Sequence, residues 1–517
     1  MKKLILLLCF VSFLAKAQDI TVASGKSFTI EKTGSVTMSG NFSNSGTFIL
    51  KSESDAFSSI IIDGTVSGNI SYNRYVNSVG TNEWDLIGSP VEGQSISSFA
   101  SANVSTLATN GDQFAIGTYD NETNTWTNYT TSTIGNAGNF NIGKGQQMAT
   151  ISGGTGILKF TGTPASTLQT QVIIDNNAAN SGTGARWNLI ANPFPSYLQG
   201  NTNAHSTNNF LTANSDKLDD SYEAIYGYDA DGTGYTVYNN SSAALFLAPG
   251  QGFMVASDNT NSDTVSFTTA MRTTTGGDDF IAGRNLENSF ELILKLYEGD
   301  SEIDHTKFYF GDGLGLDLDP GYDAGHFNQG ASLMSRLVEE DEGVGLVINA
   351  MGLESVNDVV APLELNMEAG NNFRISIGTF NINIGTNVYL EDNVQGTMTL
   401  LNDQDFELTA ENELSGVGRF FIHLTETVLS IDDKIETNYL NVFKADVNNF
   451  ITVEGLANQS NGTKLRLYTI RGKEVIFTTL NNTNNKQTIS TQGLSTGIYI
   501  VKLESGNILL TKKLFIK

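Results

Sequence analysis

Cysteine, histidine and proline are scarce in this chain. One cysteine, Cys9, occurs in 517 residues, together with seven prolines and four histidines. Cys9 falls within a leader that we expect to be removed, so the rest of the chain lacks the thiols needed for disulfides, thiol catalysis or cysteine-bound zinc. The histidines are widely spaced, and a metal site built on them would require distant convergence: His205, His305, His326 and His423.

Basic side chains are few relative to acidic ones. The chain carries 29 Lys and Arg against 55 Asp and Glu, for a formal net charge of −26. Such a surface repels phosphate backbones and anionic membranes, which argues against nucleic acid as a partner. It is compatible with divalent cations and with the solvation of an acidic exported protein.

Long apolar stretches are also missing, so the sequence predicts no transmembrane segment. The one notable apolar run, Leu4 to Leu14, is too short to span a bilayer. It follows a lysine pair and precedes the small-x-small sequence Ala15-Lys16-Ala17. This arrangement predicts a signal peptide over residues 1–17, cleaved after Ala17.

Short strands dominate the remainder, which predicts an all-β, multidomain fold. Helical periodicity is nearly absent, 52 glycines are present, and alternating apolar segments recur between turn clusters. We expect a strand-rich, solenoid-like region or small sheet over 18–78, a duplicated sandwich-like unit over 79–283, a β-sandwich over 284–428, a linker over 429–438 and a C-terminal Ig-like β-sandwich over 439–517. In the third region, the segment from Ser332 to Met351 predicts a hairpin with an acidic turn from Glu339 to Gly343.

Four landmarks recur in order and predict an internal duplication, with copies at about 79–166 and 182–273. "WDLI" at Trp84 matches "WNLI" at Trp187, and three further matches follow: Tyr119 with Tyr228, Gly143 with Ala248, and Leu158 with Val265. The shared residues of the first landmark are Trp, Leu, Ile and the following proline, which indicates a buried structural corner. Whether the copies form one domain or two is left open.

Aromatic residues occupy matching hairpin positions in the two copies. Trp126 of the first copy corresponds to Tyr235 of the second. Exposed at a hairpin tip, such rings would form a stacking platform for glycans. The alternative is cross-strand packing that stabilises each hairpin.

A glycine-rich segment from Gly311 to Gly325 concentrates four carboxylates. Oxygen ligands at this spacing are a candidate calcium site, although the pattern is not that of the twelve-residue EF loop. Asp and Gly also favour turns, which is the alternative explanation. The residues are Asp312, Asp317, Asp319 and Asp323.

The last 79 residues resemble the type A C-terminal sorting domain of the type IX secretion system of Bacteroidota. The resemblance rests on "RLYTIRGKEV" (Arg466 to Val475), "TQGLSTGIYIVKL" (Thr491 to Leu503) and "GNILLTKKLFIK" (Gly506 to Lys517). It implies handling by the type IX machinery, removal of the module and, often, attachment to surface lipopolysaccharide. The matching positions are Gly472, Lys473, Gly493, Leu494, Gly497, Tyr499, Lys512 and Lys513.

The remaining regions resemble adhesin-like β proteins of flavobacterial surfaces. The phrases "NRYV" (Asn73 to Val76), "PGQGF" (Pro249 to Phe253) and "VYLEDNVQGTMTLL" (Val388 to Leu401) carry this looser similarity. It implies a non-catalytic surface or secreted protein that is adhesin-like or structural, and it assigns no ligand. A glycan or a host or matrix component is the class of partner that such a protein would take. The alternative is a secreted glycan-binding protein or polysaccharide hydrolase, whose paired carboxylates would lie roughly 5–10 Å apart in a cleft.

Overall fold

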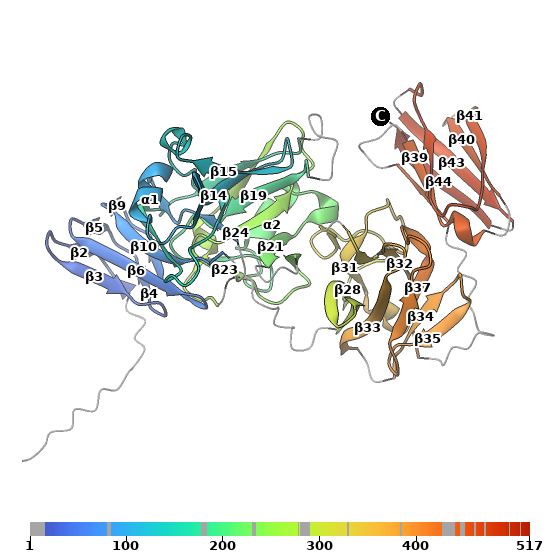
Figure 1. Cartoon of the computed structure of the whole chain (residues 1–517), viewed down its shortest axis with the longest axis horizontal. Helices are drawn as coiled ribbons and strands as arrows, with labels where there is room; N and C mark the ends of the chain where they lie inside the picture. Colours follow the sequence, from blue (N-terminus) through green and yellow to red (C-terminus); the bar gives the residue numbers. More distant parts are fainter. Residues whose placement is uncertain are drawn as a thin grey trace, which may run out of the picture.

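The computed structural model describes residues 16–79, 84–176, 184–229, 234–277, 279, 290–327, 330–382, 385–426, 440–444, 450–459, 462–469, 472–495, 497–506 and 508–516. The predicted signal peptide, apart from Lys16 and Ala17, and the predicted linker at 429–438 lie outside these residues. The all-β, multidomain class is confirmed, because strands follow one another along the whole described chain (Figure 1). No helix in the described ranges is long and apolar enough to cross a membrane.

The N-terminal region is a parallel β-ladder in which each coil adds a strand to three neighbouring faces. Coils approach closely at their turns: a Cβ on Gly64 would lie 2.2 Å from the carbonyl oxygen of Gly40, and a Cβ on Gly40 would collide with the carbonyl of Gln18. Both turns therefore need glycine. The three parallel sets are β1 (Lys16–Ala17), β4 (Ser35–Met38) and β8 (Ser59–Ile62); β2 (Ile20–Val22), β5 (Phe42–Asn44) and β9 (Val66–Ser67); and β3 (Ser27–Ile30), β6 (Thr47–Glu53) and β10 (Ile70–Tyr75), with β7 (Ala56–Phe57) paired to β6.

Two sheets of the next region share one strand order. The Trp-x-Leu-Ile motifs provide or directly precede an edge strand in each, and the aromatic hairpins lie at the opposite side. The first sheet runs β11 (Asp85–Gly88), β16 (Gly145–Met148), β14 (Gln113–Asp120) and β15 (Thr125–Thr130), with β13 (Thr109–Asn110) also on β14; the second runs β19 (Trp187–Ala191), β24 (Gly252–Ala256), β21 (Ile225–Asp229) and β22 (Gly234–Tyr238). This shared topology is what an internal duplication would produce.

Reciprocal hydrogen bonds join these two sheets. The amide of Gly88 donates to the carbonyl of Gly250, and the amide of Ala191 donates to the carbonyl of Gly143, both at 2.8 Å. Gly88 and Ala191 occupy equivalent strand positions, so the pair of contacts is related by an approximate two-fold axis. The strand register makes Gly250 the counterpart of Gly143. The sequence comparison had matched Gly143 with Ala248, two residues earlier.

The fourth landmark lies on strands with different partners. Leu158 is in β17, which joins the sheet of the N-terminal ladder through β10, whereas Val265 is in β25, which pairs with β18. The helices and remaining strands of this region are α1 (Ile96–Ala102), α2 (Phe210–Asn214), β12 (Val91–Glu92), β17 (Ile157–Pro164), β18 (Gln169–Ile173), β20 (Tyr197–Gln199), β23 (Phe246–Leu247), β25 (Asp263–Phe267) and β26 (Arg272–Thr273). Short 3-10 helices are η1 (Ile134–Asn136), η2 (Ser215–Lys217), η3 (Asp220–Tyr222) and η4 (Thr269–Met271).

The third region is one hydrogen-bonded sheet that encloses its own apolar core. The core residues run from Leu292 to Leu424 along the chain. The predicted hairpin is present, because Ser335 pairs antiparallel with Leu346. The strand order is β35 (Thr397–Leu400), β34 (Asn387–Asp392), β37 (Val417–Thr425), β32 (Asp358–Asn366), β30 (Ser332–Ser335), β31 (Leu346–Gly352), β28 (Ser301–Gly311), β27 (Phe290–Glu298), β33 (Asn372–Asn381) and β36 (Phe406–Thr409), with β29 (Ala324–Gly325) on β31 and η5 (Leu353–Asn357) after it.

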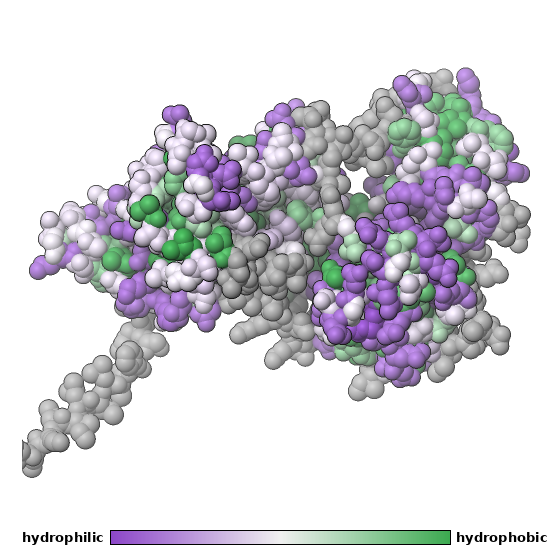
Figure 2. Space-filling model, in the orientation of Figure 1, coloured by the Kyte–Doolittle hydropathy of each residue, from purple (hydrophilic) through white to green (hydrophobic). Residues whose placement is uncertain are grey.

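The C-terminal module has two sheets and a separate core. Its buried residues, from Leu440 to Ile516, form a cluster distinct from that of the third region. In Figure 2 the third region presents a mostly hydrophilic surface, while apolar surface is visible over the N-terminal half and over this module. The sheets are β38 (Asn441–Phe443), β39 (Phe450–Glu454) and β42 (Gln487–Ser490), and β41 (Glu474–Leu480), β40 (Thr463–Thr469), β43 (Gly497–Ser505) and β44 (Ile508–Ile516), with η7 (Leu456–Asn458).

Candidate functional site

The phrases "NRYV" and "PGQGF" meet at a buried arginine. Arg74 on β10 has no exposed side-chain surface. Its Nε donates to the carbonyl of Pro249 at 2.9 Å, and its Nη2 contacts Oδ2 of Asp279 at 2.6 Å. The guanidinium also lies 4.1 Å from the ring centre of Phe57. Arg74 therefore fastens the N-terminal ladder to the duplicated unit and to the segment that follows it.

Asp85 is influenced by the charges of the same pair, Arg74 and Asp279. Its two oxygens accept hydrogen bonds from the backbone and side-chain nitrogens of Asn77 at 2.7 and 2.8 Å. Burial, and then the charge of Asp279, raise the pKa of Asp85 to about 7. Both oxygens of Asp85 accept hydrogen bonds from Asn77, so this acid fixes the start of β11 to the segment before it.

A shallow hollow lies at the junction between the ladder and the duplicated unit. It has a volume of about 240 Å³, and Phe57 and Tyr197 contribute its aromatic walls. Among the described residues that line it, Asp55 is the one acid. Retaining and inverting glycosidases need two carboxyl groups, so the hollow does not supply the pair that hydrolysis of glycans would require.

The stretch from Trp187 to Ser196 is a structural corner, as its composition predicted. Trp187 is 5% exposed, and its ring lies 4.3 Å from that of Phe327. The buried amide of Asn192 donates to three carbonyls, including that of Ser196 at 2.8 Å. The carbonyl of Pro195, in the part that the first copy lacks, accepts from the amide of Ile60 on the ladder. The unshared tail thus attaches the second copy to the N-terminal region.

The two matched hairpin aromatics have different surroundings. Trp126 is 38% exposed and packs on Tyr119 at 5.1 Å between ring centres. Tyr235 lies 4.0 Å from Phe327 of the third region. Burial raises the pKa of the Tyr235 hydroxyl well above its ordinary value. The structure therefore leaves Trp126 accessible for stacking and uses Tyr235 in packing.

The aspartates of the Gly311 to Gly325 segment organise their own loop. Asp323 accepts from the amides of Asp319 and Ala350 at 2.7 and 2.6 Å, and Asp319 accepts from the amide of Gly315 at 2.7 Å. Burial raises the pKa of Asp323 to about 7. Within the described ranges no group of three or more His, Cys, Asp or Glu residues could hold a metal ion. The structure therefore does not gather three of Asp312, Asp317, Asp319 and Asp323 into one group of carboxylates, and calcium binding by this loop stays a prediction.

In both copies a buried asparagine links a short helix to a strand by three hydrogen bonds, an arrangement that we call the asparagine clasp. The sequence analysis did not predict it. Asn103, at the end of α1, donates to the carbonyls of Phe99 and Lys159 and accepts from the amide of Lys159. In the second copy the same three bonds are made by the residues Asn214, Phe210 and Ser266. The signal that could have revealed it is the repeated pattern F-x-x-A-N, as "FASAN" and "FLTAN".

The predicted sorting residues lie at the turns and on the last two strands of the module. Gly472 and Gly493 have φ values of +80° and +90°, which disfavour any side chain. The hydroxyl of Tyr499 donates to the carbonyl of Ser495 at 2.8 Å. The other positions are Lys473 and Leu494 near these turns, Gly497 at the start of β43, and Lys512 and Lys513 on β44.

Comparison with known proteins agrees with the C-terminal assignment. Residues 445–517 match the family described as "Secretion system C-terminal sorting domain". The chain is a cargo of the type IX secretion system, and this machinery directs it to the surface or the medium. We therefore call residues 440–516 the sorting module.

The other comparisons concern the rest of the chain. No curated protein matches it. A solved structure described as "tetra-tandem repeat in extending region of large adhesion protein" aligns at 8% identity over 57% of this chain and 91% of that chain. Its TM-score of 0.13 is too low to carry an argument. Residues 9–423 match the model of one family over most of the chain, and the protein therefore belongs to the family described as "Domain of unknown function (DUF8693)".

Proposed function

We propose that this chain is a non-catalytic protein of the cell surface or the extracellular medium, adhesin-like or structural in role. Its export would begin with the signal peptide at residues 1–17, and type IX secretion would follow. Attachment to surface lipopolysaccharide after loss of the sorting module is the expected final state. A glycan or a host or matrix component would be its ligand.

This proposal rests on the observation that buried polar groups hydrogen-bond to other parts of the chain. Arg74 binds a backbone carbonyl and a carboxylate, and Asp85 and Asp323 accept hydrogen bonds from nitrogen donors. Groups with raised pKa values often mark active sites, but structural networks raise them as well. Here Arg74, Asp85 and Asp323 each bind groups at other positions of the chain, as a rigid display scaffold requires.

A second candidate, glycan binding, is favoured by the exposure of Trp126. An indole that is 38% exposed and supported from below by Tyr119 presents one face on which a sugar ring can stack. Thr125 and Thr127 precede and follow Trp126 on β15, so their exposed hydroxyl groups lie on the opposite face of the hairpin. The face that carries Trp126 thus offers mainly its apolar ring.

A glycan array and a panel of matrix proteins, probed with the secreted chain, would test both candidates. Trp126→Ala should weaken glycan binding by about tenfold, since one stacked ring contributes on the order of 1–2 kcal/mol. Phe380→Ala is the matched control, because Phe380 is also 38% exposed but lies on β33. Equal losses in both variants would exclude the hairpin as the platform, and hydrolysis of any array glycan would contradict the non-catalytic assignment.

A further inference from the structure

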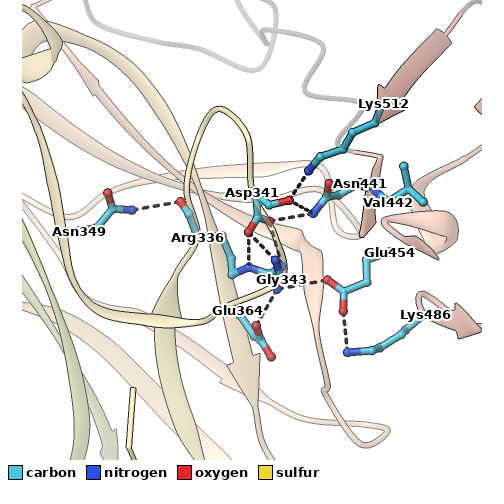
Figure 3. Close-up of polar contacts among 10 residues, drawn as sticks. All are labelled: Arg336, Asp341, Gly343, Asn349, Glu364, Asn441, Val442, Glu454, Lys486 and Lys512. Carbon is cyan, nitrogen blue, oxygen red and sulfur yellow. Dashed lines mark hydrogen bonds and ion pairs between the residues drawn. The ribbon is translucent and has the colours of Figure 1, made fainter. Parts of the chain in front are cut away.

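A largely buried ion cluster joins the sorting module to the family domain (Figure 3). Arg336, directly after β30, is 1% exposed. Its Nη1 lies 2.8 Å from Oε2 of Glu364 and 3.1 Å from Oε2 of Glu454, and its Nη2 lies 2.9 Å from Oδ2 of Asp341. Glu454 belongs to β39 of the sorting module, whereas the other three residues belong to the family domain.

The acidic turn of the predicted hairpin makes further contacts with the module. The carboxylate of Asp341 accepts from Nδ2 of Asn441 at 2.8 Å, and its carbonyl accepts from Nζ of Lys512. Gly343, at φ +92°, lies against Phe443, so that an added Cβ would be 2.1 Å from the aromatic ring. The turn therefore fits the module in both shape and charge.

Each side of this contact contains both positive and negative side chains, so the two sides can separate without leaving a buried ion unpaired. On the family-domain side, Arg336 keeps Asp341 and Glu364 as partners. On the module side, Glu454 keeps Lys486, whose Nζ is 2.6 Å from Oε1. A buried ion left without a partner is strongly destabilising, but separation here leaves every buried ion with a counter-ion on its own side.

Two properties of the whole chain favour a releasable contact held by charge. The cores of the third region and the module are separate clusters, so no shared apolar core would be broken by separation. From Tyr439 to Lys517 the chain has ten Lys and Arg and four Asp and Glu, whereas the full chain has 29 and 55. A basic module thus rests on an acidic protein, and opposite net charges attract at moderate salt.

We propose that the surface formed by Arg336, Glu364 and the acidic turn Glu339 to Gly343 is a releasable docking surface for the chain's own sorting module. The module stays bound to it when the connecting chain is cut. The surface is uncovered when the module is carried away during sorting. This inference rests on the observed contact and on the sorting assignment, and not on the adhesin-like role.

The test uses the full chain with a specific protease site inserted between Glu426 and Leu440. After cleavage, the module should co-elute with the family domain in size-exclusion chromatography at about 0.1 M salt. At about 1 M salt, where the Debye length falls to about 3 Å, the attraction between the net charges of the two parts is screened and the association should weaken, while the buried ion pairs are screened much less. Separate elution at low salt, with both parts folded by circular dichroism, would overturn the proposal.

Variants on each side of the contact distinguish docking from folding. Gly343→Val should weaken the association at least tenfold by displacing Phe443, while Gly313→Val is the matched control because nothing lies within 4 Å of its added Cβ and its φ is also positive. Glu454→Gln should weaken it by about tenfold, whereas Glu474→Gln, in an exposed pair with Arg466, should not. Retention of the module by Gly343→Val as in the parent chain would refute the assigned surface.

Discussion

At the scale of single residues, Glu223 is a buried acid whose pKa is raised by burial and by a nearby aspartate. It lies at the end of η3 and is 5% exposed. Burial, and then the charge of Asp220, raise its pKa from the ordinary 4.5 to about 7. A carboxyl whose pKa is higher in the folded state binds a proton more tightly there than in the unfolded chain.

This difference predicts that Glu223 makes the protein less stable as the pH rises. Its favourable contribution is complete below about pH 4.5 and is lost as the pH rises through about 7. Glu223→Gln should therefore match the parent at pH 4 and exceed its free energy of unfolding by about 2–3 kcal/mol at pH 8. Urea unfolding at both pH values measures this. The exposed Glu368→Gln, outside the docking surface, serves as the control. An equal gain in that variant or no gain in Glu223→Gln would contradict the assignment.

Residue-level prediction from the sequence succeeded where the local pattern decides burial. Trp187 and the prolines after it form a buried corner because an apolar strand and its stop are both local features. Tyr235 differs, since its position in the hairpin repeats that of Trp126 but its packing partner, Phe327, comes from another region of the chain. A contact of this kind depends on how two regions dock, which periodicity does not encode.

At the scale of elements, the asparagine clasp attaches a short helix to a strand in each copy. Both side chains are buried, and each one caps a helix carbonyl and bonds a strand amide and carbonyl. Helices of five to seven residues are too short to be stable alone. The clasp, together with rings such as Phe99 and Phe210, therefore holds α1 and α2 in place.

Removing either clasp should cost a similar amount of stability. Asn103→Ala and Asn214→Ala each leave a buried amide and carbonyls unsatisfied, for an expected loss of about 2–3 kcal/mol in the free energy of unfolding. Asn261→Ala, at an exposed turn, is the control. Chemical denaturation provides the measurement. A large cost in one copy and none in the other would show that the two clasps are not equivalent.

The sequence predicted the types of element better than their connections. Alternating apolar residues and glycine-rich turns indicated the ladder, the hairpins and the acidic turn, because these features depend on neighbours in sequence. The strand order of the third region pairs β32 with β37 and β27 with β33, which lie far apart in the chain. Such pairings follow from long-range packing. The duplication stays a prediction, now supported by two sheets of the same strand order.

At the scale of the whole molecule, charge separates the sorting module from the protein that it accompanies. An acidic family domain remains soluble and repels its copies, whereas the basic module is attracted to it. The docking surface around Arg336 is the place where the module contacts the family domain. Its buried ions are compensated on both sides, so removal of the module leaves a folded family domain without a stranded charge.

The division into a sorting module and a family domain predicts the cellular location of a chain that lacks the module. Deletion of residues 439–517 should leave the protein in the periplasm, because the type IX machinery would no longer recognise it, and the folded family domain has its own core. Fractionation with protease treatment of intact cells would measure surface display. Fusion of residues 439–517 to an unrelated exported reporter is the reciprocal control and should bring that reporter to the surface. Surface display of the truncated chain at the parent level would show that the module is dispensable for sorting.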